Sequence, residues 1–309
     1  MNRDMLLMKL RTLWHELSQR LKLLFKLAIS ILLLGIILRK VELHQLSSLF
    51  TSLDIMTWLT GMGISTAAVV IPAYRFGFLA TRLYSWKKKL SYWIVLQLRA
   101  LFYNNVTPGT MGADVSRVLY LSLDQMDTRR ATTLVILDRA IGFTGTLGVL
   151  GGAVFFGTVN GTNLPLAVPV KLPLLLTIAA MLILIITVPR VRTYLGKLFP
   201  NELKISSLIW IFILAIIYQS VDITTAFIYG QALGLNINIW YYFLFFPVVY
   251  IATVIPISIN GLGVREATIT GLFSLVGVAP QLAIGLSLLI FLDRMIKGMI
   301  GLAIIYQAR

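Results

Sequence analysis

Two similar stretches of sequence determine the fold that we predict: NNVTPGTMGADVSRV at 104–118 and ATVIPISINGLGVRE at 252–266. In the first, Pro108 is followed nine residues later by Arg117. In the second, Pro256 is followed nine residues later by Arg265. Both stretches lie within strongly apolar sequence, where a proline breaks a helix and an arginine is costly to bury. The pattern therefore predicts two equivalent helix breaks inside a membrane.

A second pair of matching strings follows in the same order, LDRAIG at 137–142 and LDRMIKG at 292–298. Two motifs repeated in one order indicate an internal duplication, with halves of roughly 24–157 and 172–309. In membrane proteins, Gly/Pro-interrupted segments at matching positions in two halves point to a transport site.

The composition is that of a membrane protein, because 58% of the residues are apolar and only 13% are charged. Stretches long enough to span a bilayer occur at 24–38, 55–74, 91–107, 131–157, 172–188, 205–229, 239–256 and 282–305. The connections between them are short. We therefore predict an all-α, polytopic integral membrane protein with about eight hydrophobic segments, in which 24–309 form a single transmembrane domain.

Basic residues are distributed unevenly among the polar segments. They are concentrated in 1–23, 75–89, 124–130 and 190–204, whereas 230–238 and 274–281 contain no lysine or arginine. The positive-inside rule places the basic segments in the cytoplasm. This predicts that the N-terminus and the C-terminus are both cytoplasmic.

The same charge pattern constrains the two proline-containing regions. Segments 91–107 and 113–123 lie between two basic loops, so they should enter and leave the membrane on the cytoplasmic side. Segments 239–256 and 261–273 lie between two uncharged loops, so they should do the same from the opposite side. The sequence thus predicts two re-entrant half-helix regions in an inverted repeat. Irregular backbone at that depth must be buried in protein or line a cavity.

Residues 1–23 are predicted to form an amphipathic helix in the cytoplasm or at the membrane interface. Leucines and one tryptophan share one helical face, and basic residues occupy the others. Such a helix would lie on anionic lipid. Packing on the protein's own loops is the alternative, and the basic charge could also serve only to orient the first span.

Several classes of function are excluded by the residue types present. The chain has no cysteine, and both histidines, His15 and His44, lie outside the apolar segments. We therefore expect no metal site and no cofactor. A net charge of +15 is compatible with nucleic-acid binding, but a chain this apolar is not expected to bind nucleic acid. No metalloprotease, nucleophile-elbow or P-loop motif occurs.

Polar and helix-breaking residues within the apolar segments are the candidate site, because buried charges in a bilayer must face the protein interior and be paired. The candidates in the first half are Asn105, Pro108, Gly109, Gly112, Asp114, Arg117, Asp138 and Arg139. Those in the second half are Pro256, Asn260, Gly261, Gly263, Arg265, Glu266, Asp293 and Arg294.

Each group of candidates has a functional and a structural interpretation. The glycines could open a turn so that a half-helix N-terminus and an arginine face an anion, or the arginine could simply tie two helices together. Asp114 and Arg117 are spaced to pair on one helix. Asp138 and Arg139 are adjacent and point to different sides, so each should pair elsewhere, for example across the repeat. Arg117 and Arg265 together could hold one phosphate.

At these motifs the chain resembles the lysylphosphatidylglycerol synthase transmembrane, or flippase-like, family. N-N-x-x-P-G-x-x-G-A-D-V-x-R and P-x-S-x-N-G-L-G-V-R-E are similar to its paired signatures. The resemblance covers essentially the whole chain. Gly112-Ala113-Asp114 stands where members often have G-G-D, and Asn260-Gly261-Leu262-Gly263 where they often have G-G-L-G. Because no stretch resembles the synthase's soluble aminoacyl-transferase domain, lysyl transfer is not expected.

The resemblance implies movement of a phospholipid or a polyprenyl-phosphate-linked lipid between leaflets of a prokaryotic cytoplasmic membrane. The expected partner is thus a phosphate-bearing membrane lipid. An intramembrane transferase and a scaffold for a biosynthetic membrane complex are the competing functions. Glycines in 142–157 would allow close helix packing within the chain or in a homo-oligomer.

Overall fold

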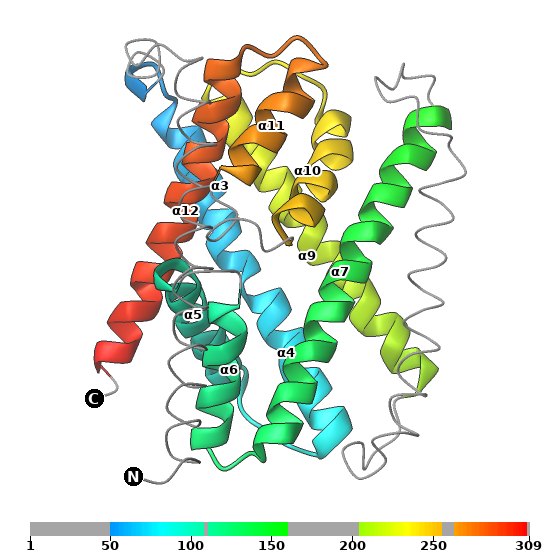
Figure 1. The fold of residues 1–309 in the computed structure, drawn as a ribbon, viewed down its shortest axis with the longest axis vertical. Coiled ribbons are helices and arrows are strands. Elements are labelled where there is room, and N and C mark those ends of the chain that lie inside the picture. The colour runs from blue at the N-terminus through cyan, green and yellow to red at the C-terminus, as the bar shows by residue number, and fades with distance from the viewer. Residues whose placement is uncertain (1–49, 108–110, 160–203, 255–262, 308–309) are drawn as a thin grey trace, which may run out of the picture.

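The computed structural model describes residues 50–107, 111–159, 204–254 and 263–307 (Figure 1). All regular secondary structure in these ranges is helical. The helices are α3 (Ile55–Ala68), α4 (Val70–Tyr84), α5 (Leu90–Val106), α6 (Gly112–Leu123), α7 (Thr128–Val159), α9 (Ile205–Ala232), α10 (Ile239–Val254), α11 (Val264–Ser274) and α12 (Pro280–Gln307). The predicted helix at 1–23 and the predicted spans at 24–38 and 172–188 lie outside the described residues.

Three helical stretches in the described part are long and apolar enough to cross a membrane: Ile55–Tyr84, Thr128–Gly157 and Ile205–Ala232. A helix needs about 20 apolar residues for this purpose. α12 has 28 residues, but it carries Asp293, Arg294 and Lys297 near its middle. The chain is an integral membrane protein, and the part that the structure describes contains helices as its only regular secondary structure.

The first of these stretches is broken at Val69, where α3 ends and α4 begins. Pro72 explains the break, because it lacks the N–H that would bond to the carbonyl four residues earlier. α4 then continues to Tyr84, so the prediction of a polar loop from residue 75 is wrong. Arg75 lies in the helix and is only 5% exposed.

α5 and α6 form a hairpin whose open end is held together by Tyr92, which donates a hydrogen bond to Asp124 at 2.6 Å. The segments before α5 and after α6 also line one pocket together, through Lys88 and Arg130. The chain therefore enters and leaves this hairpin at the same end of the molecule. α10 packs on α11 in the second half.

Figure 1 shows the two pairs at opposite ends of the molecule, with α5 and α6 low in the view and α10 and α11 high. The longer helices α7, α9 and α12 and the α3–α4 stretch run between these ends. The inverted repeat that the sequence predicts would also place the two pairs at opposite ends, and the repeat itself stays a prediction. The position of the membrane relative to the hairpins remains a prediction.

Buried apolar side chains of the described residues form two main clusters, one around each hairpin. The first joins α4 to α7 and includes Phe76, Trp93 and Leu134. The second joins α9 to α12 and includes Tyr242 and Phe273. Each hairpin is thus anchored on its own apolar core, and α7 and α9 contribute side chains to both cores.

Two helix contacts depend on glycine. A methyl group added at Gly301 of α12 would lie 2.1 Å from the Leu98 carbonyl oxygen of α5, so only glycine permits this approach. Gly145 of α7 also approaches α9 closely, because an added methyl group would lie 2.7 Å from Ala215 Cβ. At Gly145 the predicted close packing occurs within the chain.

Candidate functional site

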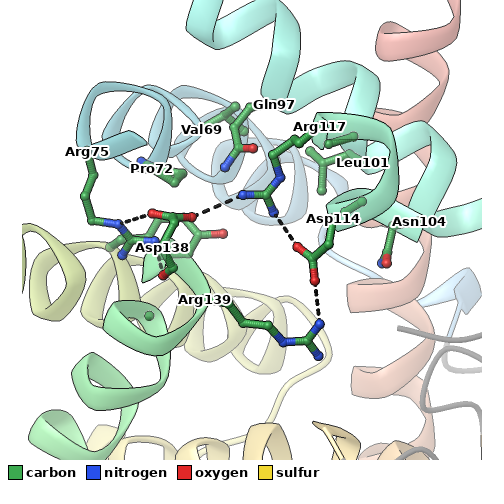
Figure 2. Close-up of a pocket in the computed structure, with 14 residues that line it drawn as sticks. Val69, Pro72, Arg75, Gln97, Leu101, Asn104, Asp114, Arg117, Asp138 and Arg139 are labelled. Atoms are coloured by element: carbon green, nitrogen blue, oxygen red, sulfur yellow. Dashed lines mark hydrogen bonds and ion pairs between the residues drawn. The ribbon is translucent and has the colours of Figure 1, made fainter. Parts of the chain in front are cut away.

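A polar cavity of about 320 Å³ lies where α4, α5, α6 and α7 meet near the break in the first long helix (Figure 2). Its charged lining consists of Arg75 from α4, Asp114 and Arg117 from α6, and Asp138 and Arg139 from α7. All except Arg75 were predicted site residues. The cavity therefore brings together the charged candidates of the first half.

These side chains form one alternating chain of charges. Arg75 Nε donates to Asp138 Oδ1 at 2.8 Å, and Arg117 Nη1 donates to Asp138 Oδ2 at 3.1 Å. The other terminal nitrogen of Arg117 donates to Asp114 Oδ1 at 3.3 Å. Arg139 Nη1 donates to Asp114 Oδ2 and completes the chain, as Figure 2 shows. We call these five residues the ion ladder.

Helix geometry explains how the ladder is assembled. Asp114 and Arg117 are three residues apart and therefore share one face of α6, as the sequence predicted. Asp138 and Arg139 are neighbours on α7, so one points toward α4 and the other toward the tip of α6. The prediction that each pairs elsewhere is confirmed, but the partners lie in the first half and not across the repeat.

Side-chain exposure is lowest at the Arg75–Asp138 end of the ladder and highest at Arg139. The side chains of Arg75 and Asp138 are 6% and 4% exposed, that of Arg117 is 13% exposed, and that of Arg139 is 38% exposed. Arg139 Nε and Nη2 have no hydrogen-bond partner among the described residues. Arg139 therefore has exposed donors that are available to a ligand.

Arg117 is held from several sides. Its guanidinium lies 5.5 Å from the centre of the Phe76 ring, and its two terminal nitrogens contact Asp138 and Asp114. Its Nε is buried and has no partner in the described structure. A buried donor without a partner is uncommon in proteins and calls for an explanation such as an absent ligand or water.

Two mostly apolar grooves meet the ladder at Arg139. One, of about 750 Å³, runs between α6 and α7 and is lined by both Asp114 and Arg139. The other, of about 470 Å³, lies between α7 and α10 and is lined by Arg139 together with Phe143, Tyr250 and Val254. Arg139 therefore lines the polar cavity and both grooves.

The equivalent arginine of the second half has a different environment. Arg265 is 4% exposed and donates to Glu266 Oε1 at 2.7 Å and to Ser287 Oγ at 3.2 Å. The other carboxylate oxygen of Glu266 accepts the N–H of Gly263 at 2.6 Å. Gly263 has φ of 85°, which favours glycine, and it begins α11. This cluster holds the start of α11 against α12.

The second LDR motif forms another buried cluster. Lys297 Nζ donates to Asp293 Oδ2 at 2.8 Å and to Ser65 Oγ of α3 at 2.5 Å. Arg294 is partly buried and has no ion pair among the described residues. Its backbone oxygen accepts a hydrogen bond from Asn105 Nδ2 at 2.9 Å, so Asn105 joins the end of α5 to α12.

The structure thus separates the candidates into three groups. Asp114, Arg117, Asp138 and Arg139 line the cavity, whereas Asn105, Gly263, Arg265, Glu266, Asp293 and Arg294 are not among its lining residues. Gly112 packs where an added methyl group would lie 1.7 Å from Thr107 Oγ1, so it allows α6 to approach α5. Pro108, Gly109, Pro256, Asn260 and Gly261 lie outside the described residues.

Sequence reasoning missed three polar lining residues: Arg75, Gln97 and Tyr218. Arg75 could have been found from Pro72. Here too a proline within a long apolar run is followed by an arginine, as in the motifs at Pro108 and Pro256, although the spacing is three residues and not nine. Gln97 and Tyr218 carry no comparable signal, because single polar residues are common in buried helices.

Comparison with known proteins places the chain in a family. The family model for the lysylphosphatidylglycerol synthase TM region matches residues 23–299, which is most of the chain. No curated relative matches it. Because the match extends through both motif pairs, the chain belongs to the lysylphosphatidylglycerol synthase transmembrane-region family, a membrane family whose function is related to lipids.

Proposed function

We propose that this protein moves a phosphate-bearing membrane lipid between the two leaflets. The lipid headgroup occupies the polar cavity, and its chains remain in the apolar grooves. The observation that carries this proposal is the position of Arg139, which lines the polar cavity and both grooves. A ligand that bridges these surfaces must have a polar end and an apolar end, as a lipid does.

The ladder provides the chemistry that a phosphate requires. A charged group at the centre of a bilayer is costly, so a headgroup crosses only where the protein replaces its hydration. Arg139 has two donor nitrogens free of partners in the described structure, and a planar guanidinium binds phosphate oxygens in a forked geometry. A phosphate group can therefore replace Asp114 as the partner of Arg139 at the exposed end of the ladder.

The arrangement of the hairpins supports an alternating-access mechanism. The α5–α6 and α10–α11 pairs lie at opposite ends of the molecule. In transporters built from inverted repeats, one repeat moves against the other so that a fixed site opens alternately to the two sides of the membrane. We propose that both pairs are re-entrant, that the Lys88 and Arg130 end is cytoplasmic, and that the cavity lies between these pairs.

Leaflet exchange in vesicles tests the proposal. Purified protein is reconstituted with headgroup-intact phosphatidylglycerol carrying a fluorescent acyl chain, and accessibility to a membrane-impermeant quencher is followed over time. The wild-type protein should make inner-leaflet lipid accessible faster than protein-free vesicles do. Arg139→Gln should slow the exchange about tenfold or more, since it removes a charge-assisted contact.

Arg129→Gln provides a matched control, because Arg129 is an exposed arginine on the same helix and lies outside the cavity. This control should exchange lipid at the wild-type rate. Equal rates for Arg139→Gln and wild type, with both proteins folded, would contradict the proposed role of the cavity. A new lipid product detected by mass spectrometry would instead favour the transferase.

A further inference from the structure

We infer, on the basis of the proposed function, that the cavity selects headgroups that carry net negative charge and lack an ammonium group. Unmodified phosphatidylglycerol fits this requirement, whereas a lipid bearing a lysyl group does not. The inference concerns which lipid is accepted and is independent of the rate at which any lipid crosses.

The balance of charge in the cavity favours an anionic headgroup. Three arginines and two aspartates line it, so the charged lining carries one net positive charge. Headgroups enter a partly buried space, where charges interact more strongly than in water. An anionic headgroup would neutralise this excess, and a cationic headgroup would add to it.

Every carboxylate oxygen in the ladder already has a guanidinium partner. Arg75 and Arg117 occupy the two oxygens of Asp138, and Arg117 and Arg139 occupy those of Asp114. An ammonium group entering the cavity would therefore find no free carboxylate. The nearby Asp222 accepts a hydrogen bond from Tyr250 at 2.6 Å and is not among the lining residues.

Displacing an ion-pair partner from the ladder also costs less for an anionic headgroup than for an ammonium group. An entering phosphate needs to displace only the contact between Asp114 and Arg139, at the exposed end of the ladder. Asp114 then keeps its contact with Arg117, and Asp138 keeps both of its arginines. An ammonium group would have to displace an arginine from a carboxylate and leave that guanidinium in the same cavity.

Neutral acceptors do not change this conclusion. Gln97, Asn104 and Tyr218 line the cavity, and side chains of these types can accept a hydrogen bond from an ammonium group. They offer no negative charge to offset the three guanidiniums. The lining therefore permits polar, uncharged parts of a headgroup, such as glycerol hydroxyls, and rejects its cationic parts.

The test measures binding and leaflet exchange of two lipids that differ only in the lysyl group, phosphatidylglycerol and lysylphosphatidylglycerol. Native mass spectrometry in mixed-lipid nanodiscs gives the binding ratio, and the vesicle assay gives the exchange rates. The wild-type protein should prefer phosphatidylglycerol about tenfold or more.

Two variants should shift this preference in opposite directions. Arg139→Gln balances the charged lining and should reduce the preference to about threefold or less. Asp114→Asn raises the net positive charge and frees Arg139, so it should increase the preference above that of wild type. Arg129→Gln should leave the preference unchanged, and thermal unfolding in detergent verifies that each variant is folded.

Equal or tighter binding of lysylphosphatidylglycerol by the wild-type protein would overturn the inference. Exchange of both lipids at equal rates would overturn it while leaving the transport function intact. If neither lipid is exchanged, the transport proposal fails, and the binding ratio still decides whether the cavity selects by charge.

Discussion

The two halves of the molecule use the same motifs in different ways. Arg117, the arginine of the first proline motif, lies in a polar cavity and is linked to a more exposed arginine. Arg265, its equivalent in the second half, is buried and bonded to Glu266 and Ser287. The same motif thus occurs once in a cluster that borders a cavity and once in a buried cluster that joins α11 to α12.

The aspartates of the two LDR motifs have different ion-pair partners. Asp293 pairs with Lys297, four residues later on the same helix. The residue at the same place after Asp138 is Gly142, which lines the cavity and has no side chain to offer. Asp138 instead pairs with Arg75 from α4 and Arg117 from α6. Glycine at this place leaves space beside an ion network that spans three helices.

The largest expected effect is on stability in the second half. Glu266→Gln leaves Arg265 buried without its counter-charge, and breaking a buried ion pair in this way costs about 3–5 kcal/mol. Asp114→Asn, in the first half, should lower the free energy of unfolding by only about 1 kcal/mol, since Asp114 is partly exposed and Arg117 retains Asp138. Denaturant-induced unfolding in detergent measures both. Similar losses would remove the distinction between the halves.

A double-mutant cycle on the Asp293 cluster should show strong coupling. Lys297→Met leaves Asp293 buried with its negative charge unpaired and should destabilise the protein by about 3 kcal/mol. Adding Asp293→Asn should recover much of this loss, because the buried charge is then gone. Strictly additive losses in the unfolding measurement would show that the pair does not interact.

Glycine substitutions should distinguish the tip of the first hairpin from an open position in the second. Gly112→Ala places a methyl group against Thr107 and the Tyr103 carbonyl and should cost about 1–3 kcal/mol. Gly271→Ala in α11 meets nothing within 4 Å and should be neutral or stabilising by up to about 1 kcal/mol. Thermal unfolding of the two variants measures these changes in stability. A Gly112→Ala protein as stable as wild type would argue against the tight contact.

Sequence reasoning predicted the architecture better than the site. Hydropathy gave the helical membrane class, and the family resemblance is confirmed by the match over residues 23–299. The motif spacing also located Asp114, Arg117, Asp138 and Arg139. What it could not give was exposure: Arg117 and Arg265 have identical motif positions, and only the packing of neighbouring helices decides which of them borders a cavity.

Arg75 was missed for a related reason. Charge counting assigned it to a cytoplasmic loop because it opens a basic run that continues through Arg82 to Lys89. The helix in fact continues to Tyr84, and Asp138 supplies the counter-charge that makes a buried arginine acceptable. A partner 63 residues away cannot be recognised from local sequence.

The smallest expected effect concerns an exposed charge outside both clusters. The Thr57 hydroxyl donates to Asp54 at 2.6 Å and, with the N–H groups that begin α3, holds the pKa of the Asp54 carboxyl below its usual range. Asp54 should therefore stabilise the fold fully above its unfolded-state pKa and lose this contribution as the pH falls through the lowered value. Stability measured against pH should fall slightly less steeply at acidic pH in Asp54→Asn than in wild type; identical curves would contradict this role.

The most direct test of the account compares leaflet exchange by Arg139→Gln and Arg265→Gln, each normalised to folded protein in the vesicle membrane. If the first-half cavity binds the headgroup and the second-half cluster stabilises the fold, Arg139→Gln should lose about tenfold or more in rate per folded molecule. Arg265→Gln should yield less folded protein but exchange lipid at nearly the wild-type rate per folded molecule. An equal loss in both folded variants would support a phosphate site shared by the two halves, and wild-type exchange by Arg139→Gln would contradict the account.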